Sequence, residues 1–218
     1  MKAMILAAGL GSRMRPLTDT LPKPLLEVKG KALIVWHLEK LARNGFKEVV
    51  INIAHLGYKI PEYLGDGSSY GLNIFYSDEQ EMGALESAGG IKKALPLLGD
   101  EPFLVVNGDV YCNYEFDSLF NLKDKKAHLI LVKNPEHNPK GDFGLNDGLV
   151  LNNADTMHTF SGIGYYHPSF FDEVALQKSP LTPLLREAIT KNDISGELFN
   201  NMWHDVGTPQ RLKEINDD

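Results

Sequence analysis

Two glycines and several cations follow an apolar run near the N-terminus. Residues 3–7 are apolar and lead into Gly9, Gly11 and Arg13, and Lys23 follows between two prolines. Small residues let backbone N–H groups approach a ligand closely, and fixed cations beside them suit a polyphosphate. The apolar run has the length of a buried strand. The sequence therefore predicts a phosphate-binding loop at the end of a strand.

Three kinds of nucleotide-binding loop could begin in this way. A dinucleotide fingerprint needs Gly or Ala where Met14 stands, and a P-loop needs Gly-Lys-Ser/Thr where the chain has Ser12–Met14. The third kind holds a triphosphate with loop amides and an arginine, here Arg13, and fits the sequence. A surface glycine turn would not explain why Arg13, Arg15 and Lys23 gather after one strand.

The residues Leu6–Arg13 together with Pro22–Pro24 resemble the signature of sugar-1-phosphate nucleotidyltransferases. The resemblance implies an α/β, Rossmann-like three-layer fold with a mostly parallel central sheet and a smaller sugar-binding lobe. It implies transfer of a nucleotidyl group to a sugar 1-phosphate, with Arg13 and Lys23 as catalytic residues and Glu79 accepting from a pyrimidine N–H. The implied nucleotide-binding residues are Ala7, Ala8, Gly9, Gly11, Ser12, Arg13, Lys23, Glu79, Glu86 and Ser87.

A second polar group, Asn107–Asp109, follows a predicted strand. Ligands of open α/β sheets bind outside the carboxyl ends of such strands, so Asp109 is placed to meet the phosphates through a hard cation such as Mg²⁺. Trp203–Pro209 resembles the closing motif of the same family. The resemblance implies that Asp205 is the second Mg²⁺ ligand and that Asn107 contacts the sugar phosphate.

The sugar side is predicted in the second half of the chain. Asp142, Gly144 and Gly162 lie in glycine-containing segments that could face a pyranose, and we expect them to contact the sugar phosphate. Many relatives carry Glu-Lys-Pro before the second of these segments, whereas this chain has Asp155–His158. That difference favours the short branch of the family that uses UTP and N-acetylmuramate 1-phosphate, in recycling of cell-wall sugars.

Other functions stay open at this point. Within the family, the substrates could be mannose 1-phosphate with GTP, or glucose 1-phosphate with UTP or dTTP. Outside it, the chain could be a non-catalytic subunit that binds nucleotide-sugars, or an NAD-dependent oxidoreductase. Arg13, Lys23, Asp109 and Asp205 together argue against a pure binder, and Met14 argues against the oxidoreductase.

The elements that must position these residues alternate in the first half. Strands are expected at 49–53, 72–76 and 103–106, and helices at 31–44, 58–64 and 87–95, the last capped by Ser87. This order predicts a mostly parallel sheet covered on both faces. We expect one domain, residues 1–218, with a nucleotide lobe (1–110) and a sugar lobe with closing helices (111–218). A hairpin turn at 146–148 and a helix start at Thr208-Pro209 are predicted in the second lobe.

Composition limits the partners. The 218 residues include 22 Lys and Arg against 29 Asp and Glu, giving a net charge of −7, which argues against nucleic-acid binding. The apolar runs are far shorter than a membrane span. The lone cysteine, Cys112, fits a reducing cytoplasm. A cytoplasmic monomer is the expectation.

Overall fold

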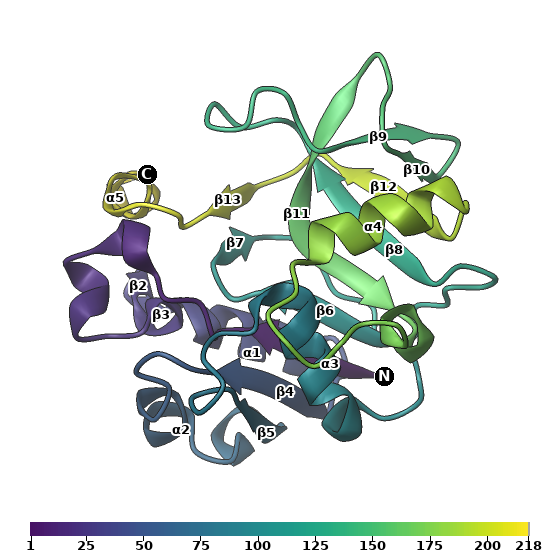
Figure 1. Cartoon of the computed structure of the whole chain (residues 1–218). Coiled ribbons are helices and arrows are strands. Elements are labelled where there is room, and N and C mark those ends of the chain that lie inside the picture. The colour runs from purple at the N-terminus through teal and green to yellow at the C-terminus, as the bar shows by residue number, and fades with distance from the viewer. Residues whose placement is uncertain (218) are drawn as a thin grey trace.

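The strand β1 (Lys2–Leu6) has a parallel neighbour on each edge in the computed structural model, which describes residues 1–217 (Figure 1). Its side chains alternate between the two faces of the sheet. Ala3 and Ile5 pack into one hydrophobic cluster, with helices α1 (Leu33–Arg43) and α2 (Lys59–Leu64), whereas Met4 packs into another, with helix α3 (Glu86–Leu98). Both faces are therefore covered by helices, which gives the three layers.

The first half of the chain builds a wholly parallel block. The strands β4 (Glu48–Ile53), β5 (Asn73–Asp78) and β6 (Phe103–Asn107) join β1 in the order β5-β4-β1-β6. Each neighbouring pair in this block is parallel. The parallel sheet predicted for residues 1–110 is confirmed, because helices α1 to α3 supply the long crossovers that parallel neighbours require.

The second half makes the whole nine-stranded sheet mixed rather than mostly parallel. It adds five strands in the order β11-β8-β12-β10-β9 after β6. The strand β11 (Met157–Tyr166) runs antiparallel to both β6 and β8 (Ala127–Val132), and only the β8–β12 pair is parallel within this half. The other new strands are β12 (Ile194–Phe199), β10 (Leu149–Leu151) and β9 (Phe143–Asn146).

The predicted hairpin turn explains part of this change in direction. The strands β9 and β10 pair antiparallel, with Asn146 opposite Leu149 and only Asp147 and Gly148 between them. Both turn residues have positive φ, 49° for Asp147 and 76° for Gly148, as a two-residue type I′ turn requires. A turn of this length leaves no room for a crossover helix, so the paired strands must be antiparallel.

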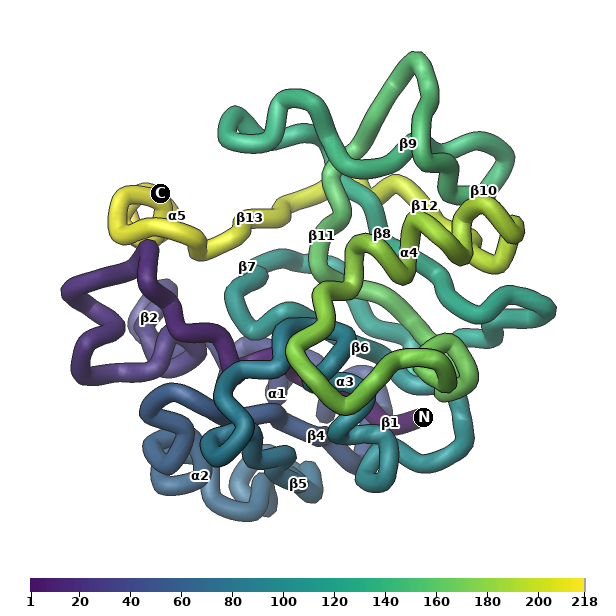
Figure 2. Tube along the Cα trace, in the orientation of Figure 1, coloured from purple at the N-terminus to yellow at the C-terminus, as the bar shows by residue number. Residues whose placement is uncertain are grey.

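The C-terminal segment returns to the N-terminal part of the fold (Figure 2). The strand β13 (Trp203–Asp205) pairs with β7 (Val110–Cys112), and helix α5 (Pro209–Asp217) follows. The Thr208 hydroxyl accepts from the Arg211 amide at 3.3 Å, so the predicted helix start is confirmed. Leu212 and Ile215 of α5 pack with Val28 of β2 (Glu27–Val28), which pairs with β3 (Lys31–Ala32).

The predicted capping of α3 by Ser87 is wrong. The helix begins at Glu86, and Ser87 lies in its first turn without a capping hydrogen bond. The carbonyl of Ser179 instead accepts from the amides of Ala88 and Gly89, at 3.0 and 3.1 Å. Ser179 precedes helix α4 (Leu181–Thr190), which covers the same face of the sheet as α3. Within residues 1–217, no helix combines the length and apolar composition needed to cross a membrane.

Candidate active site

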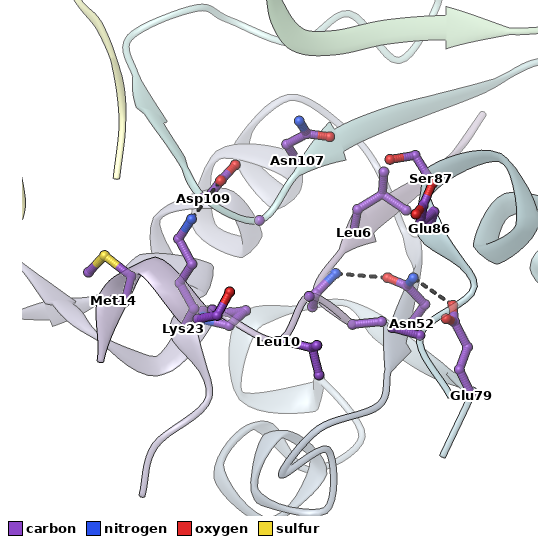
Figure 3. A pocket seen from close by; sticks show the side chains of 18 of the residues that line it. Leu6, Leu10, Met14, Lys23, Asn52, Glu79, Glu86, Ser87, Asn107 and Asp109 are labelled. Atoms are coloured by element: carbon purple, nitrogen blue, oxygen red, sulfur yellow. Dashed lines mark hydrogen bonds and ion pairs between the residues drawn. The ribbon is translucent and has the colours of Figure 1, made fainter. Parts of the chain in front are cut away.

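A cavity of about 700 Å³ lies beyond the carboxyl ends of the parallel strands (Figure 3). It is lined by every residue predicted to bind the nucleotide, together with Asn107 and Asp109. These nucleotide residues are Ala7, Ala8, Gly9, Gly11, Ser12, Arg13, Lys23, Glu79, Glu86 and Ser87. Segments that are far apart in the sequence thus meet at one sheet edge, as the rule for open α/β sheets predicts.

The loop after β1 uses its two glycines differently. Gly11 has φ +61°, and a Cβ there would lie 2.8 Å from the Thr18 methyl group, so the fold itself requires glycine. The Thr18 hydroxyl donates to the Gly11 carbonyl at 2.8 Å. At Gly9 a Cβ would meet no atom within 4 Å, so only a ligand could demand glycine at this position.

Lys23 and Asp109 form an ion pair at one side of the cavity. The Lys23 Nζ lies 2.6 Å from Asp109 Oδ2, and the Lys23 side chain is only 13% exposed. Lys23 lies between Pro22 and Pro24 and is the first residue of a short 3-10 helix. Asp109 lies in the turn between β6 and β7. That turn packs closely, because a Cβ on Gly108 would lie 2.7 Å from the Leu6 carbonyl oxygen. A cation and a carboxylate are thereby fixed beside the glycine loop.

Asn107 is held by a bulge in the neighbouring strand. The register of β11 shifts between Phe160 and Ile163, and Gly162 in this bulge has φ +79°. A Cβ on Gly162 would lie 2.6 Å from the Asn107 Nδ2, so the backbone of β11 rests directly against the Asn107 amide. Of the residues predicted for the sugar phosphate, Asn107 lines the cavity. Gly162 does not line the cavity but packs against the Asn107 side chain.

Glu79 is fully buried at the floor of the cavity. Its Oε1 accepts from Asn52 Nδ2 at 2.7 Å and its Oε2 from the Leu85 amide at 2.8 Å. Asn52 Oδ1 in turn accepts from the Ala7 amide at 2.8 Å (Figure 3). Sequence reasoning missed Asn52, since it reads as the polar end of an apolar strand. A contact from Glu79 to a base stays a prediction and would need a remaining lone pair.

A cation from the second half of the chain also lines the cavity. Lys178 lines it and lies 3.4 Å from Glu86 Oε1, and both side chains are substantially exposed. Glu86 has φ +60°, an uncommon backbone conformation for this residue type. No motif in residues 175–180 distinguishes Lys178 from a surface lysine, so the sequence offered no signal for it.

Asp205 lines a second cavity of about 650 Å³ rather than the first. Its Oδ1 lies 3.1 Å from His137 Nε2, and its Oδ2 pairs with the Arg211 guanidinium. The backbone nevertheless runs beside Asp109, because the Val206 amide donates to the Asp109 carbonyl at 2.7 Å. Within residues 1–217, no group of three or more His, Cys, Asp or Glu is arranged to hold a metal. The predicted two-carboxylate Mg²⁺ site therefore stays a prediction.

Two residues predicted for the sugar side lie away from the cavities. Asp142 accepts from the Phe160 amide at 2.8 Å and from Asn138 Nδ2 at 3.2 Å, so both of its oxygens already have partners in the protein. At Gly144, a Cβ would lie 2.4 Å from the Ala154 Cβ. In this structure Asp142 ties a loop to β11, and Gly144 allows close packing.

A buried histidine lies beneath the β6–β7 turn. Burial and, next, the Lys40 cation lower the pKa of His37 from 6.5 to about 3, opposed by the Asp109 charge and by a hydrogen bond with the Val110 backbone. His37 and Lys40 both lie on the buried face of α1. The imidazole is therefore neutral wherever the protein is folded above pH 4 or so.

Known proteins resemble this chain over nearly its whole length. An N-acetylmuramate alpha-1-phosphate uridylyltransferase of Neisseria meningitidis serogroup B is 53% identical over 223 residues, covering 98% of this chain and 96% of that protein. A protein of the same name from Caulobacter vibrioides is 33% identical, covering 95% of this chain and 92% of that protein. Both similarities extend over at least 95% of this chain.

The fold matches a solved structure equally completely. A putative glucose-1-phosphate thymidylyltransferase from Bacillus anthracis, solved with sucrose, superposes with a TM-score of 0.86 at 20% identity, covering all of this chain and 94% of the other. A family model described as "Nucleotidyl transferase" matches residues 2–148, which include the glycine loop, Lys23 and Asp109. With these matches, the chain belongs to the nucleotidyl transferase family.

Proposed function

We propose that this protein transfers a uridylyl group from UTP to N-acetylmuramate 1-phosphate, releasing pyrophosphate. The observation that carries the reaction type is the single cavity that joins the glycine loop, Arg13, Lys23 and Asp109. The substrates are inferred from the Neisseria meningitidis relative, whose name specifies uridylyl transfer and N-acetylmuramate α-1-phosphate and whose identity of 53% extends over nearly the whole chain.

The reaction needs positioned charge more than it needs proton transfer. The sugar-phosphate oxygen is already anionic, so it attacks the α-phosphorus in line without a general base, and the bond to pyrophosphate breaks. Loop amides after β1 and Arg13 would bind the triphosphate, and Lys23 would neutralise charge as the second anion approaches. The Asn107 amide, held against Gly162, would donate to the sugar phosphate.

Asp109 and Asp205 fit a magnesium ion by the chemistry of their donors. Carboxylate oxygens are the ligands that Mg²⁺ prefers, and the backbone hydrogen bond from Val206 to Asp109 holds the turn that carries Asp109 beside the end of β13, which carries Asp205. Each carboxylate now faces a cationic partner, Lys23 or Arg211, which such an ion would have to displace. When bound, the ion would supply charge neutralisation to the phosphates.

A substrate panel tests this proposal. The purified protein, with Mg²⁺, is given each of UTP, dTTP, CTP, GTP and ATP in turn with N-acetylmuramate 1-phosphate, glucose 1-phosphate or mannose 1-phosphate, and pyrophosphate release is measured. We expect rapid release only with UTP and N-acetylmuramate 1-phosphate. Broad use of hexose phosphates would contradict the sugar assignment, and no release with any pair would contradict the reaction. Size-exclusion chromatography of the same sample tests the predicted monomer.

A further inference from the structure

The buried side chains of Asn52 and Glu79 connect two opposite walls of the nucleotide cavity. Asn52 is the next-to-last residue of β4 and accepts from the Ala7 amide in the glycine loop, at 2.8 Å. Glu79 follows β5 and accepts from the Leu85 amide, which immediately precedes Glu86, at 2.8 Å. The 2.7 Å bond from Asn52 Nδ2 to Glu79 Oε1 closes the connection.

The surroundings are shaped around this pair. Asn52 is 3% exposed and Glu79 is fully buried. Gly90 of α3 faces them, and a Cβ at that position would lie 2.7 Å from Glu79 Oε1 and 2.9 Å from Asn52 Nδ2. Glycine inside a helix costs about 1 kcal/mol relative to alanine, so an alanine here would be favoured if the space allowed it. Gly90 thus leaves room for the polar pair.

We propose that Asn52 and Glu79 are positioning residues for the nucleotide, acting as a hydrogen-bonded spacer between the phosphate loop and the segment at Glu86 and Ser87. The spacer fixes how far the Ala7 amide stands from the start of α3, and both segments line the cavity. Binding geometry has to be held to about half an ångström for catalysis, which a buried and fully bonded connection provides. This inference rests on the proposed function, since it concerns the nucleotide of that reaction.

The hydrogen bonds have a direction that makes the spacer testable. Glu79 has to accept at both oxygens, and Asn52 has to accept from Ala7 while donating to Glu79. In Glu79→Gln, every orientation of the two side-chain amides places one donor against another donor. In Asn52→Asp, two carboxylate oxygens face each other. The double variant Asn52→Asp/Glu79→Gln reverses the central bond: the new amide at position 79 donates to the new carboxylate at position 52, and every group again has a partner.

The experiment compares the wild type, both single variants and the double variant at pH 8. The nucleotide is the one that the wild type uses in the substrate panel, which we expect to be UTP. Calorimetric titration gives its Kd, steady-state kinetics give KM for each substrate, and thermal melting reports the fold. We expect each single variant to raise the nucleotide Kd about tenfold or more, with a much smaller change in the KM for sugar phosphate. In the double variant, the nucleotide Kd should return to within about threefold of the wild-type value.

Tyr114→Phe is the matched control. Its hydroxyl donates to Glu197 at 2.9 Å in a largely buried setting outside the cavity, so its loss should lower the melting temperature without changing the nucleotide Kd. The inference fails if a folded single variant binds nucleotide like the wild type. It also fails if the folded double variant binds as weakly as the singles. A wild type that does not use UTP contradicts the proposed function instead, and the comparison then proceeds with the nucleotide that it accepts.

Discussion

At the scale of single residues, the Lys23–Asp109 ion pair should matter for turnover far more than for stability. Lys23→Ala removes a fixed cation from the phosphates, and Asp109→Ala removes a predicted metal ligand. We expect each to lower kcat about a hundredfold or more, the usual effect of deleting a preorganised charge-stabilising group. Lys23→Ala should change the melting temperature little, because water can solvate the remaining Asp109 carboxylate, which is 30% exposed, whereas Asp109→Ala should lower it more, because the Lys23 cation is only 13% exposed. Pyrophosphate release and thermal melting are the two measurements.

The pair Lys31–Glu39 provides the control for this prediction. Its nitrogen and oxygen are also 2.6 Å apart, but it is exposed and lies outside the cavity. The Lys31→Ala variant should therefore have the kcat of the wild type. Near-normal kcat in folded Lys23→Ala would contradict the role given to Lys23.

Gly9 separates the needs of the ligand from those of the fold. A methyl group at this position would touch no protein atom within 4 Å, and the residue has no left-handed φ that an alanine would resist. Gly9→Ala should leave the free energy of unfolding unchanged or slightly higher, because alanine restricts the unfolded chain. It should nevertheless weaken nucleotide binding in calorimetric titration, since the methyl group occupies the space beside the loop amides. Unchanged nucleotide affinity would show that the phosphates lie elsewhere.

At the scale of elements, the contact between α3 and the segment before α4 joins the first half of the chain to the second. The Ser179 carbonyl accepts from two amides of the first turn of α3, and a Cβ on Gly89 would lie 2.3 Å from the Gln177 carbonyl oxygen. Gly89→Ala should therefore lower the free energy of unfolding by about 1–3 kcal/mol, as overpacking typically does. Urea unfolding measures the effect.

Pro96→Ala is the comparison within the same helix. Pro96 lies near the other end of α3 and is exposed, so alanine there should be neutral or stabilising. If Gly89→Ala were equally harmless, the segment at Gln177 would have to be free to move away from α3.

These elements also show how far sequence reasoning reaches. The glycine loop is contiguous in the chain, and the parallel strands alternate regularly with helices, so both were predictable. The bond between Asn52 and Glu79 and the approach of Lys178 depend on how distant segments pack, which no local pattern records. Ser87 failed as a cap because the Ser179 carbonyl takes the first-turn amides of α3. The antiparallel pairings of β11 were missed for the same reason, since strand direction is decided by tertiary neighbours.

At the scale of the whole molecule, His37 should make stability depend on pH. Burial, and then Lys40, lower its pKa in the folded protein to about 3, against 6.5 in the unfolded chain. Between these two pH values, His37 binds a proton in the unfolded chain but not in the folded protein. The contribution of neutral, buried His37 to stability is therefore complete above pH 6.5 and is lost as the pH falls towards 3. The slope is about 1.4 kcal/mol per pH unit. Urea unfolding at several pH values between 5 and 7.5 measures it.

His37→Gln isolates this contribution, since the other histidines are common to both proteins. The variant should unfold more readily at pH 7.5, where a well-packed neutral ring is lost, yet should lose less stability than the wild type on acidification to pH 5. Equal losses in the two proteins would mean that His37 takes up its proton without unfolding.

The strand β11 has a consequence for how the molecule moves. It bonds to β6 along one edge and to β8 along the other, so the sheet continues without a break from the parallel block of the first half of the chain into the strands of the second half. A hinge between the two halves of the sheet would have to break this ladder of hydrogen bonds. We therefore expect substrates to enter and products to leave through movement of surface loops, while the sheet beneath the cavity stays rigid. The same continuity favours one cooperative unfolding transition, in which the cavity and the strands of the second half of the chain unfold together.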